Sequence, residues 1–110
     1  MSIFDILLKK ENTDYWAVGF TNKSKKQVDK LPDKIFELLV LLVEDLKQLG
    51  PAPGKQWSNY GKFKGTGKKD KRHCHLSKGN PTYVCCWEVK DKNIKIIEVY
   101  YVGTHEKAPY

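Results

Sequence analysis

Residues 32–50 constrain the fold more than any other part of this chain, because apolar residues recur there with helical spacing behind a proline. The apolar stripe consists of Ile35, Leu39, Leu42, Leu46 and Leu49. Pro32 suits the first turn of a helix, and the Gly-Pro-Ala-Pro-Gly sequence at 50–54 ends the helix firmly. A helix with so broad an apolar face must pack on another element, and a sheet is the natural partner here.

Four segments rich in β-branched and aromatic residues predict the strands of that sheet: residues 15–21, 71–76, 82–90 and 94–102. Strong turn signals separate the last three, with Lys-Gly-Asn-Pro at 78–81 and Asp-Lys-Asn at 91–93. Such short separators predict antiparallel hairpins. We therefore expect a meander with the helices on one face and the other face free to bind a partner.

Together these segments predict an α+β fold in which an antiparallel sheet is packed on one face by two N-terminal helices. The first, short helix is expected at 23–30 with Asn22 as its N-cap. At 110 residues the chain fits a single domain, 1–110, in which residues 1–13 form a possible accessory arm.

The N-terminal sequence lacks the pattern of a signal peptide, and the longest apolar run, residues 38–43, is far shorter than the roughly 20 residues that a membrane span needs. Three cysteines, two of them adjacent, form no disulfide framework. We therefore expect a cytoplasmic protein without a membrane partner.

Charge is concentrated in residues 55–78, which hold eight basic residues and one acid, while the rest of the chain is balanced. This stretch accounts for the net charge of +7. A concentrated basic segment attracts polyanions, and RNA contacts are expected from Lys62, Lys64, Lys68, Lys69, Lys71 and Lys78. The alternative is a solvated lysine loop.

Histidines at the ends of two strands indicate possible RNA-cleaving chemistry. In a meander, His75 and His105 can approach one face from two directions. One imidazole would take the proton of a 2′-hydroxyl and the other would protonate the leaving 5′-oxygen, while Arg72 or a lysine stabilises the phosphate. Histidines in strands also serve as structural hydrogen-bonding groups, so this is one of two interpretations.

Strand alternation raises an objection to that site, because it places Arg72 and Cys74 on one face and His73 and His75 on the other. Arg72 and His75 share a site only if the strand bulges or ends early. A zinc site is disfavoured for a similar reason, since the candidate ligands alternate along strands and point apart: His73, Cys74, His75, Cys85 and Cys86. We expect neither a metal nor another cofactor.

Aromatic residues interleave with the lysines of the basic stretch. Trp57, Tyr60 and Phe63 could stack on bases, or they could form a hydrophobic cluster of the loop itself. The C-terminal Tyr110 leaves the same two possibilities open, since it could stack on a nucleotide or simply end the chain.

From about Trp16 onward the chain resembles the RelE/ParE superfamily of bacterial toxin-antitoxin toxins, and most closely its YafQ-like branch. The resemblance rests on four features in order: Lys-Leu-Pro at 30–32 between the helices, Lys-Phe-Lys-Gly at 62–65, Arg-His-Cys-His-Leu at 72–76, and Val-Gly-Thr-His at 102–105. The third and fourth features are the specific ones.

This resemblance implies a small RelE-like fold and a ribosome-dependent mRNA endonuclease that stops translation and is neutralised by a cognate antitoxin. It implies that His75 and His105 are catalytic, that Arg72 binds the phosphate, and that Tyr110 positions a base. Its departures are the absence of a carboxylate in residues 77–81 and one extra residue before the terminal aromatic. Two alternatives follow: a ParE-like gyrase inhibitor without catalysis, and a catalytically weakened relative that binds RNA or the antitoxin.

Overall fold

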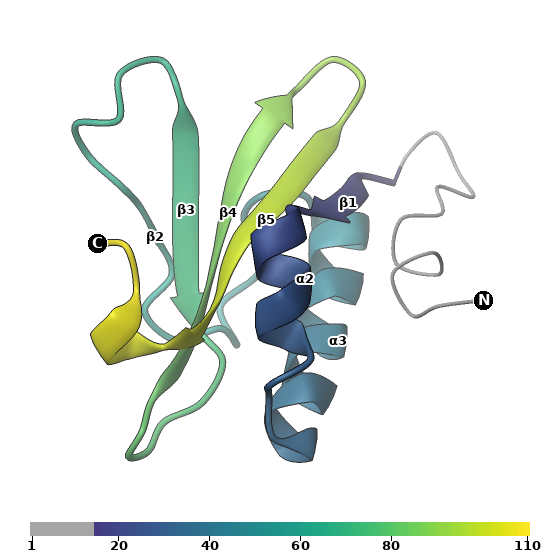
Figure 1. Ribbon diagram of the computed structural model, residues 1–110. Helices are drawn as coiled ribbons and strands as arrows, with labels where there is room; N and C mark the ends of the chain where they lie inside the picture. Colours follow the sequence, from purple (N-terminus) through teal and green to yellow (C-terminus); the bar gives the residue numbers. More distant parts are fainter. Residues whose placement is uncertain (1–14) are drawn as a thin grey trace.

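The computed structural model describes residues 15–110, so the accessory arm expected at 1–13 lies outside the described residues. Five strands form one sheet in the order β1-β5-β4-β3-β2 (Figure 1). Their bounds are Ala17–Phe20 for β1, Gly61–Lys62 for β2, Asp70–His75 for β3, Tyr83–Asp91 for β4 and Ile96–Thr104 for β5. The predicted meander is confirmed, because β3, β4 and β5 pair antiparallel in sequence order.

The α+β class is confirmed, and the sheet is mixed because β1 pairs parallel with β5. β1 precedes both helices and no short turn joins it to β5, so it is not constrained to run antiparallel, and its short sequence carries no sign of its partner. The strand β2 was not predicted, because its two residues show no alternation that would indicate a strand.

The helix α2 (Asn22–Val28) lies along the edge of β5 where β1 ends (Figure 1). The Ser24 hydroxyl donates to the Val99 carbonyl at 2.8 Å, and the Val102 amide donates to Gln27 Oε1 at 3.0 Å. These bonds satisfy backbone groups that an edge strand would otherwise expose. The N-cap is Thr21, whose Oγ1 accepts from the Ser24 amide at 3.1 Å, so the predicted Asn22 cap is wrong by one residue.

The long helix α3 (Asp33–Leu49) covers one face of the sheet, as its apolar stripe predicted. Four of its side chains are at most 1% exposed and pack with residues of the strands: Leu39, Leu42, Val43 and Leu46. Leu49, the last residue of the predicted stripe, is instead 59% exposed. No helix within residues 15–110 is long and apolar enough to cross a membrane.

The opposite face of the sheet, called the open face below, carries no α-helix among the described residues. A smaller apolar cluster of Val84, Cys86 and Tyr101 lies there, with Phe63, Tyr100 and Ala108 packed on it. The short 3-10 helix η1 (His105–Lys107) follows β5 and leads the C-terminal residues onto this face (Figure 1). The open face is therefore where side chains of β3 and of the C-terminal residues meet.

Candidate active site

The rings of His75 and His105 lie side by side on the open face. Their centroids are 5.5 Å apart and their planes meet at 75°, an edge-to-face arrangement. His75 is the last residue of β3, and His105 is the first residue of η1. Two residues separated by thirty positions meet because β3 and β5 both flank β4.

Backbone hydrogen bonds fix the positions from which both imidazoles project. The His75 amide donates to the Ser58 carbonyl at 2.8 Å, and the His105 amide donates to the Thr82 carbonyl at 2.8 Å. His75 is thus bonded to the segment just before β2, and His105 is bonded to the residue just before β4. Such ties place two side chains reproducibly, as acid-base chemistry requires.

A pocket of about 280 Å³ adjoins the two rings, and it is lined by His75, Gly79, Asn80, Pro81, Thr82, Thr104, His105 and Glu106. Glu106 supplies a carboxylate to a site whose sequence lacks one after His75. Glu106 is not among the site residues that the sequence predicted. Its position directly after His105 in the sequence indicated that it could lie at the same site.

Tyr110 continues this cluster of rings on the other side of His105. Its ring centroid lies 5.0 Å from that of His105, 5.5 Å from that of His73 and 5.4 Å from that of Phe63. The rings of Phe63 and His73 are themselves 4.6 Å apart. His73 was considered above as a zinc ligand only, although alternation along the strand already placed it on the same face as His75.

Burial favours the neutral form of two of these histidines. It lowers the pKa of His75, and the nearby His105 lowers it further. Burial also lowers the pKa of His73, with smaller contributions from His75 and His105. Nδ1 of His73 is buried without a hydrogen-bond partner, so a proton on that nitrogen would be unsatisfied. His73 is therefore held as a neutral ring under Tyr110.

Arg72 does not join this site, and the prediction that it binds phosphate beside His75 is contradicted by its position. Its side chain lies on the face of β3 that carries Cys74, because the pairing with β4 is regular and contains no bulge. The guanidinium donates from Nε and Nη2 to the two carboxylate oxygens of Asp70, both at 2.9 Å, and from Nη1 to the Tyr60 hydroxyl at 2.9 Å. The residue is 8% exposed, and the bonds to Asp70 and Tyr60 engage all three of its nitrogens.

Asp70 is the centre of an ion cluster at the far end of β3. Lys62 and Lys92 approach its Oδ2 at 4.0 Å and 3.6 Å. The hydrogen bonds from Arg72, together with these cations, lower the pKa of Asp70 to about 2 although burial opposes the shift. The predicted RNA contact Lys62 therefore belongs in part to a structural cluster.

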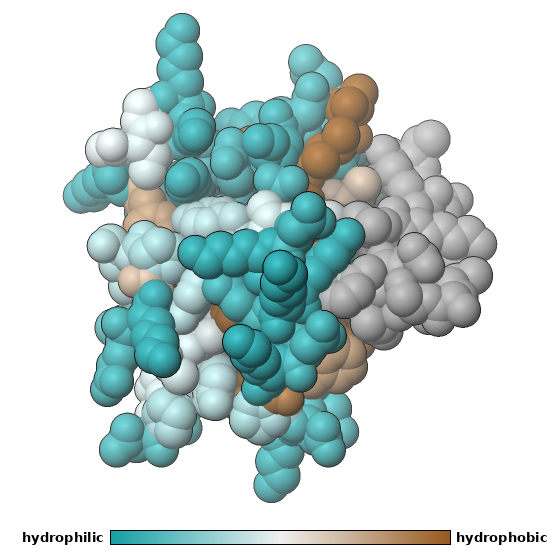
Figure 2. Space-filling view, in the orientation of Figure 1, coloured by the Kyte–Doolittle hydropathy of each residue, from teal (hydrophilic) through white to brown (hydrophobic). Residues whose placement is uncertain are grey.

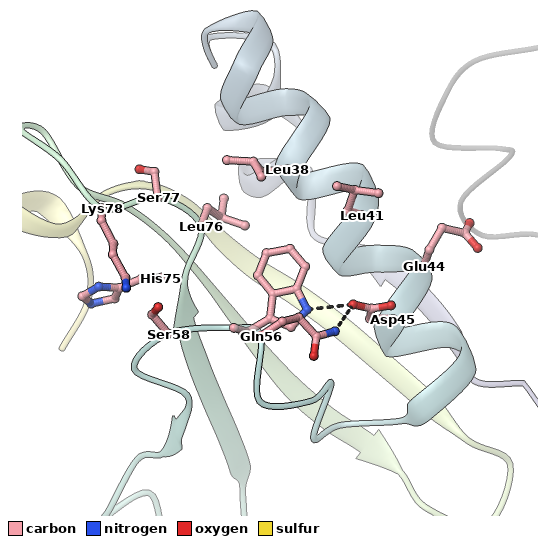
Figure 3. A pocket seen from close by; sticks show the side chains of 11 residues that line it. Leu38, Leu41, Glu44, Asp45, Gln56, Ser58, His75, Leu76, Ser77 and Lys78 are labelled. Carbon is pink, nitrogen blue, oxygen red and sulfur yellow. Dashed lines mark hydrogen bonds between the residues drawn. The ribbon is translucent and has the colours of Figure 1, made fainter.

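The other predicted RNA-binding lysines divide between the two ends of β3. Lys64, Lys68 and Lys69 precede the strand and lie at its end remote from His75. Lys71 lies on the open face, its Nζ 4.9 Å from the centroid of the Tyr100 ring. Lys78 and His75 both line a groove of about 500 Å³ that extends to Leu38 and Leu41 of α3 (Figure 3). Lys78 is thus the predicted lysine that shares a cavity with a candidate catalytic histidine.

The aromatic residues of the basic stretch separate in the structure. Trp57 belongs to the main core, and its indole Nε1 donates to Asp45 Oδ2 at 2.8 Å. The Tyr60 ring stacks on Trp87 with centroids 6.2 Å apart. Both therefore pack within the protein, and Phe63 alone of the three lies beside the histidines.

Among residues 15–110 no group of three or more histidine, cysteine or acidic side chains could hold a metal ion. Cys74 and Cys85 belong to the main core, whereas Cys86 belongs to the cluster on the open face. The candidate zinc ligands are thus divided between two faces of the sheet, as strand alternation predicted.

Comparisons with known proteins identify the fold. No protein-family model matches the sequence, and no curated protein matches it. Among solved structures, a chain of the archaeal RelE-RelB complex from Pyrococcus horikoshii OT3 superimposes with a TM-score of 0.67 at 20% identity, covering 86% of this chain and 99% of that chain. The chain therefore has a RelE-like fold, as its resemblance to the RelE/ParE superfamily predicted.

Proposed function

We propose that this protein is the toxin of a type II toxin-antitoxin pair and acts as a ribosome-dependent mRNA endoribonuclease. The observation that carries the proposal is the pair of imidazoles, 5.5 Å apart, on the open face of a RelE-like fold. The net charge of +7 supports a polyanionic substrate. A gyrase-binding protein with this fold would have no need of two adjacent histidines at a pocket.

In the proposed reaction His75 is the general base, because burial lowers its pKa and keeps it neutral. It removes the proton of the 2′-hydroxyl, and the 2′-oxygen attacks the adjacent phosphorus. His105, which is exposed to solvent and can be reprotonated from it, donates a proton to the leaving 5′-oxygen. The products are a 2′,3′-cyclic phosphate and a 5′-hydroxyl, and no metal takes part.

Lys78 takes the role for which the sequence had suggested Arg72. It lines the same groove as His75, and no ion pair holds it within the described residues. An ammonium group there would stabilise the charge that grows on the phosphate oxygens. Tyr110, 54% exposed, presents a ring beside His105 on which a base can stack.

The proposed partners are the ribosome with its mRNA and a cognate antitoxin. The matching structure contains RelE together with RelB, which supports a partner chain for this protein too. Because ribosomes and messages are the targets, the proposed site of action is the cytoplasm.

Inducible expression tests the proposal. The wild type, a His75→Ala/His105→Ala double variant and a Lys34→Ala control on the exposed surface of α3 are compared for growth, translation and message cleavage by primer extension. We expect arrest and new 5′ ends with the wild type and the control, and neither with the double variant. Binding of the antitoxin to the double variant would show that it folds.

Three results would contradict the proposal. Intact messages with arrested DNA synthesis would favour the ParE-like gyrase inhibitor. Growth without arrest, together with retained RNA or antitoxin binding, would favour the catalytically weakened relative. Cleaved messages that carry 5′-phosphates would exclude attack by the 2′-oxygen.

A further inference from the structure

A second pocket on the open face gathers lysines from three separate elements. It measures about 390 Å³ and is lined by Thr21, Lys23, Lys71, Tyr100, Tyr101, Lys107 and Pro109. Lys23 comes from α2, Lys71 from β3 and Lys107 from η1. The three lysines therefore line one pocket only in the folded chain, and Lys71 is the one of the three that the sequence predicted to bind RNA.

The lining of this pocket contains no carboxylate. Glu88, which lies directly opposite Lys71 in β4, is ion-paired with Lys90 at 3.6 Å. The three lysines make no ion pair with the described residues. Glu106 lines an adjoining pocket together with Lys23 and Lys107, but it forms no ion pair with either of them. The three lysines repel one another, and a bound anion would relieve this repulsion. Figure 2 shows that hydrophilic side chains predominate on the face that is turned toward the viewer in Figure 1.

Two tyrosines, Tyr100 and Tyr101, form part of the wall of this pocket beside the lysines. An irregularity in the pairing of β4 with β5 falls between Cys86 and Trp87, where Tyr100 is skipped in the register. As a result Tyr100 and its neighbour Tyr101 both contribute to the open face rather than alternating. Lys71 lies over the Tyr100 ring with its Nζ 4.9 Å from the centroid. Part of the wall is thus aromatic and held by the sheet.

The pocket is aligned with the candidate active site along β3. Lys71, His73 and His75 project from the same face, because each is two residues from the next. Four residues of a strand span about 13 Å, which is the separation expected between the backbone positions of Lys71 and His75. His73, whose ring meets that of Tyr110 edge-to-face, lies between them. A single-stranded RNA that follows this line would meet the histidines, then Tyr110, then the lysine pocket.

We propose that Lys23, Lys71 and Lys107 form a second phosphate site, which binds the RNA backbone at a nucleotide flanking the cleaved bond. This inference rests on the proposed ribonuclease function. An acidic segment of a protein partner would also be attracted by three lysines. RNA is favoured because the pocket, the aromatic rings and the two histidines lie in one line on one face, and stacking rings beside cations are typical of single-strand binding sites.

Binding of a short oligoribonucleotide with 2′-O-methyl groups tests the site without requiring cleavage, because the nucleophilic hydroxyl is blocked. The test variant is Lys23→Gln/Lys107→Gln, in which both residues are exposed. The matched control is Lys26→Gln/Lys34→Gln, which removes the same charge from exposed positions outside the pocket. We expect about a tenfold weaker affinity for the test variant, and a salt dependence reduced by about 0.7 for each lost phosphate contact. The control should change affinity by less than about twofold.

A set of oligonucleotides, each with a single uncharged methylphosphonate, locates the contact. For the wild type one methylphosphonate position outside the cleaved bond should weaken binding, and for the test variant that position should have no effect. Equal losses for test and control variants would overturn the proposal, as would unchanged methylphosphonate interference. Unchanged RNA binding with weakened antitoxin binding would assign the pocket to the protein partner instead. If the wild type binds in this way but cleaves no message, the proposed function fails and the phosphate site stands.

Discussion

The ring of Tyr110 lies 5.0 Å from the ring of His105, so the C-terminal residue of the chain is in contact with one of the two candidate catalytic groups. Phe63 and His73 support the same ring from the sheet. Residues from β3, from the segment after β2 and from the C-terminus thus form one aromatic group.

Replacing Tyr110 by alanine should lower message cleavage about tenfold or more, because stacking of a base on an aromatic ring contributes about 1–3 kcal/mol. Tyr110→Phe should keep cleavage within about twofold, since the ring and not the hydroxyl makes the contacts. Single-turnover cleavage on programmed ribosomes measures both variants. A phenylalanine variant as weak as the alanine variant would show that the hydroxyl is what matters.

His73 should act through Tyr110. In His73→Ala the Tyr110 ring loses a neighbour at 5.5 Å, and the NMR signals of the His105 ring should shift because the ring current from Tyr110 changes. In a Tyr110→Ala background the same substitution should shift His105 much less. His73→Phe should restore the wild-type spectrum in part. Equal shifts in both backgrounds would mean that His73 acts on His105 directly.

The pH dependence of cleavage should reveal His75 as a partly buried base. His75 acts only when neutral, and burial lowers its pKa below the ordinary histidine value of 6.5. The rate should therefore rise with pH along a limb whose midpoint lies below 6.5, and it should already be near its plateau on that limb at neutral pH. Single-turnover rates between pH 5 and 8 measure this midpoint. A rising limb centred above 6.5 would contradict His75 as the base.

Arg72 should prove structural. Asp70→Asn removes the carboxylate that binds the guanidinium in two places, and we expect a loss of about 2–3 kcal/mol in the free energy of unfolding because Arg72 is left partly unpaired. Urea titration measures the loss. Lys92→Gln is the control, since that exposed lysine contacts the same carboxylate from 3.6 Å and should cost far less.

The same pair predicts an acid-sensitive contribution to stability. The pKa of Asp70 is about 2 in the folded chain against 3.8 ordinarily, so its stabilisation is complete above about pH 4 and is lost as the pH falls toward 2. After allowance for solvent screening this contribution is about 1–2 kcal/mol. Asp70→Asn should flatten the stability profile in that range. An unchanged slope would show that another carboxylate dominates.

The cysteines should be unreactive in the folded protein. Cys74, Cys85 and Cys86 are all 0% exposed, and burial raises the pKa of Cys74 and of Cys86 to about 12. Since the thiolate is the reactive form, a thiol reagent at pH 8 should label none of them in the native state and all three in urea. Rapid native labelling would mean that β3 and β4 separate readily.

The sequence by itself determined both helices and the strands β1, β3, β4 and β5, because each has a local cause. The stripe from Ile35 to Leu46 produced α3, and turn residues produced the hairpins of β3, β4 and β5. Alternation also predicted that Arg72 and His75 would lie on opposite faces, which the regular pairing of β3 with β4 confirms. The expectation that both would nevertheless serve one site came from their residue types and again from the resemblance, whereas strand alternation correctly predicted that they lie on opposite faces.

Only the tertiary structure decided which distant residues meet. Sequence pattern is local, whereas the contact of His75 with His105 and the lysine pocket of Lys23, Lys71 and Lys107 depend on strand order and on the path of the C-terminal residues. The guanidinium of Arg72 binds Asp70 and Tyr60 because of how the folded chain packs, which the spacing of residues in the sequence does not predict. Periodicity in the sequence shows which face of the sheet a side chain occupies. Which residues it contacts on that face depends on the order of the strands and on the path of the rest of the chain.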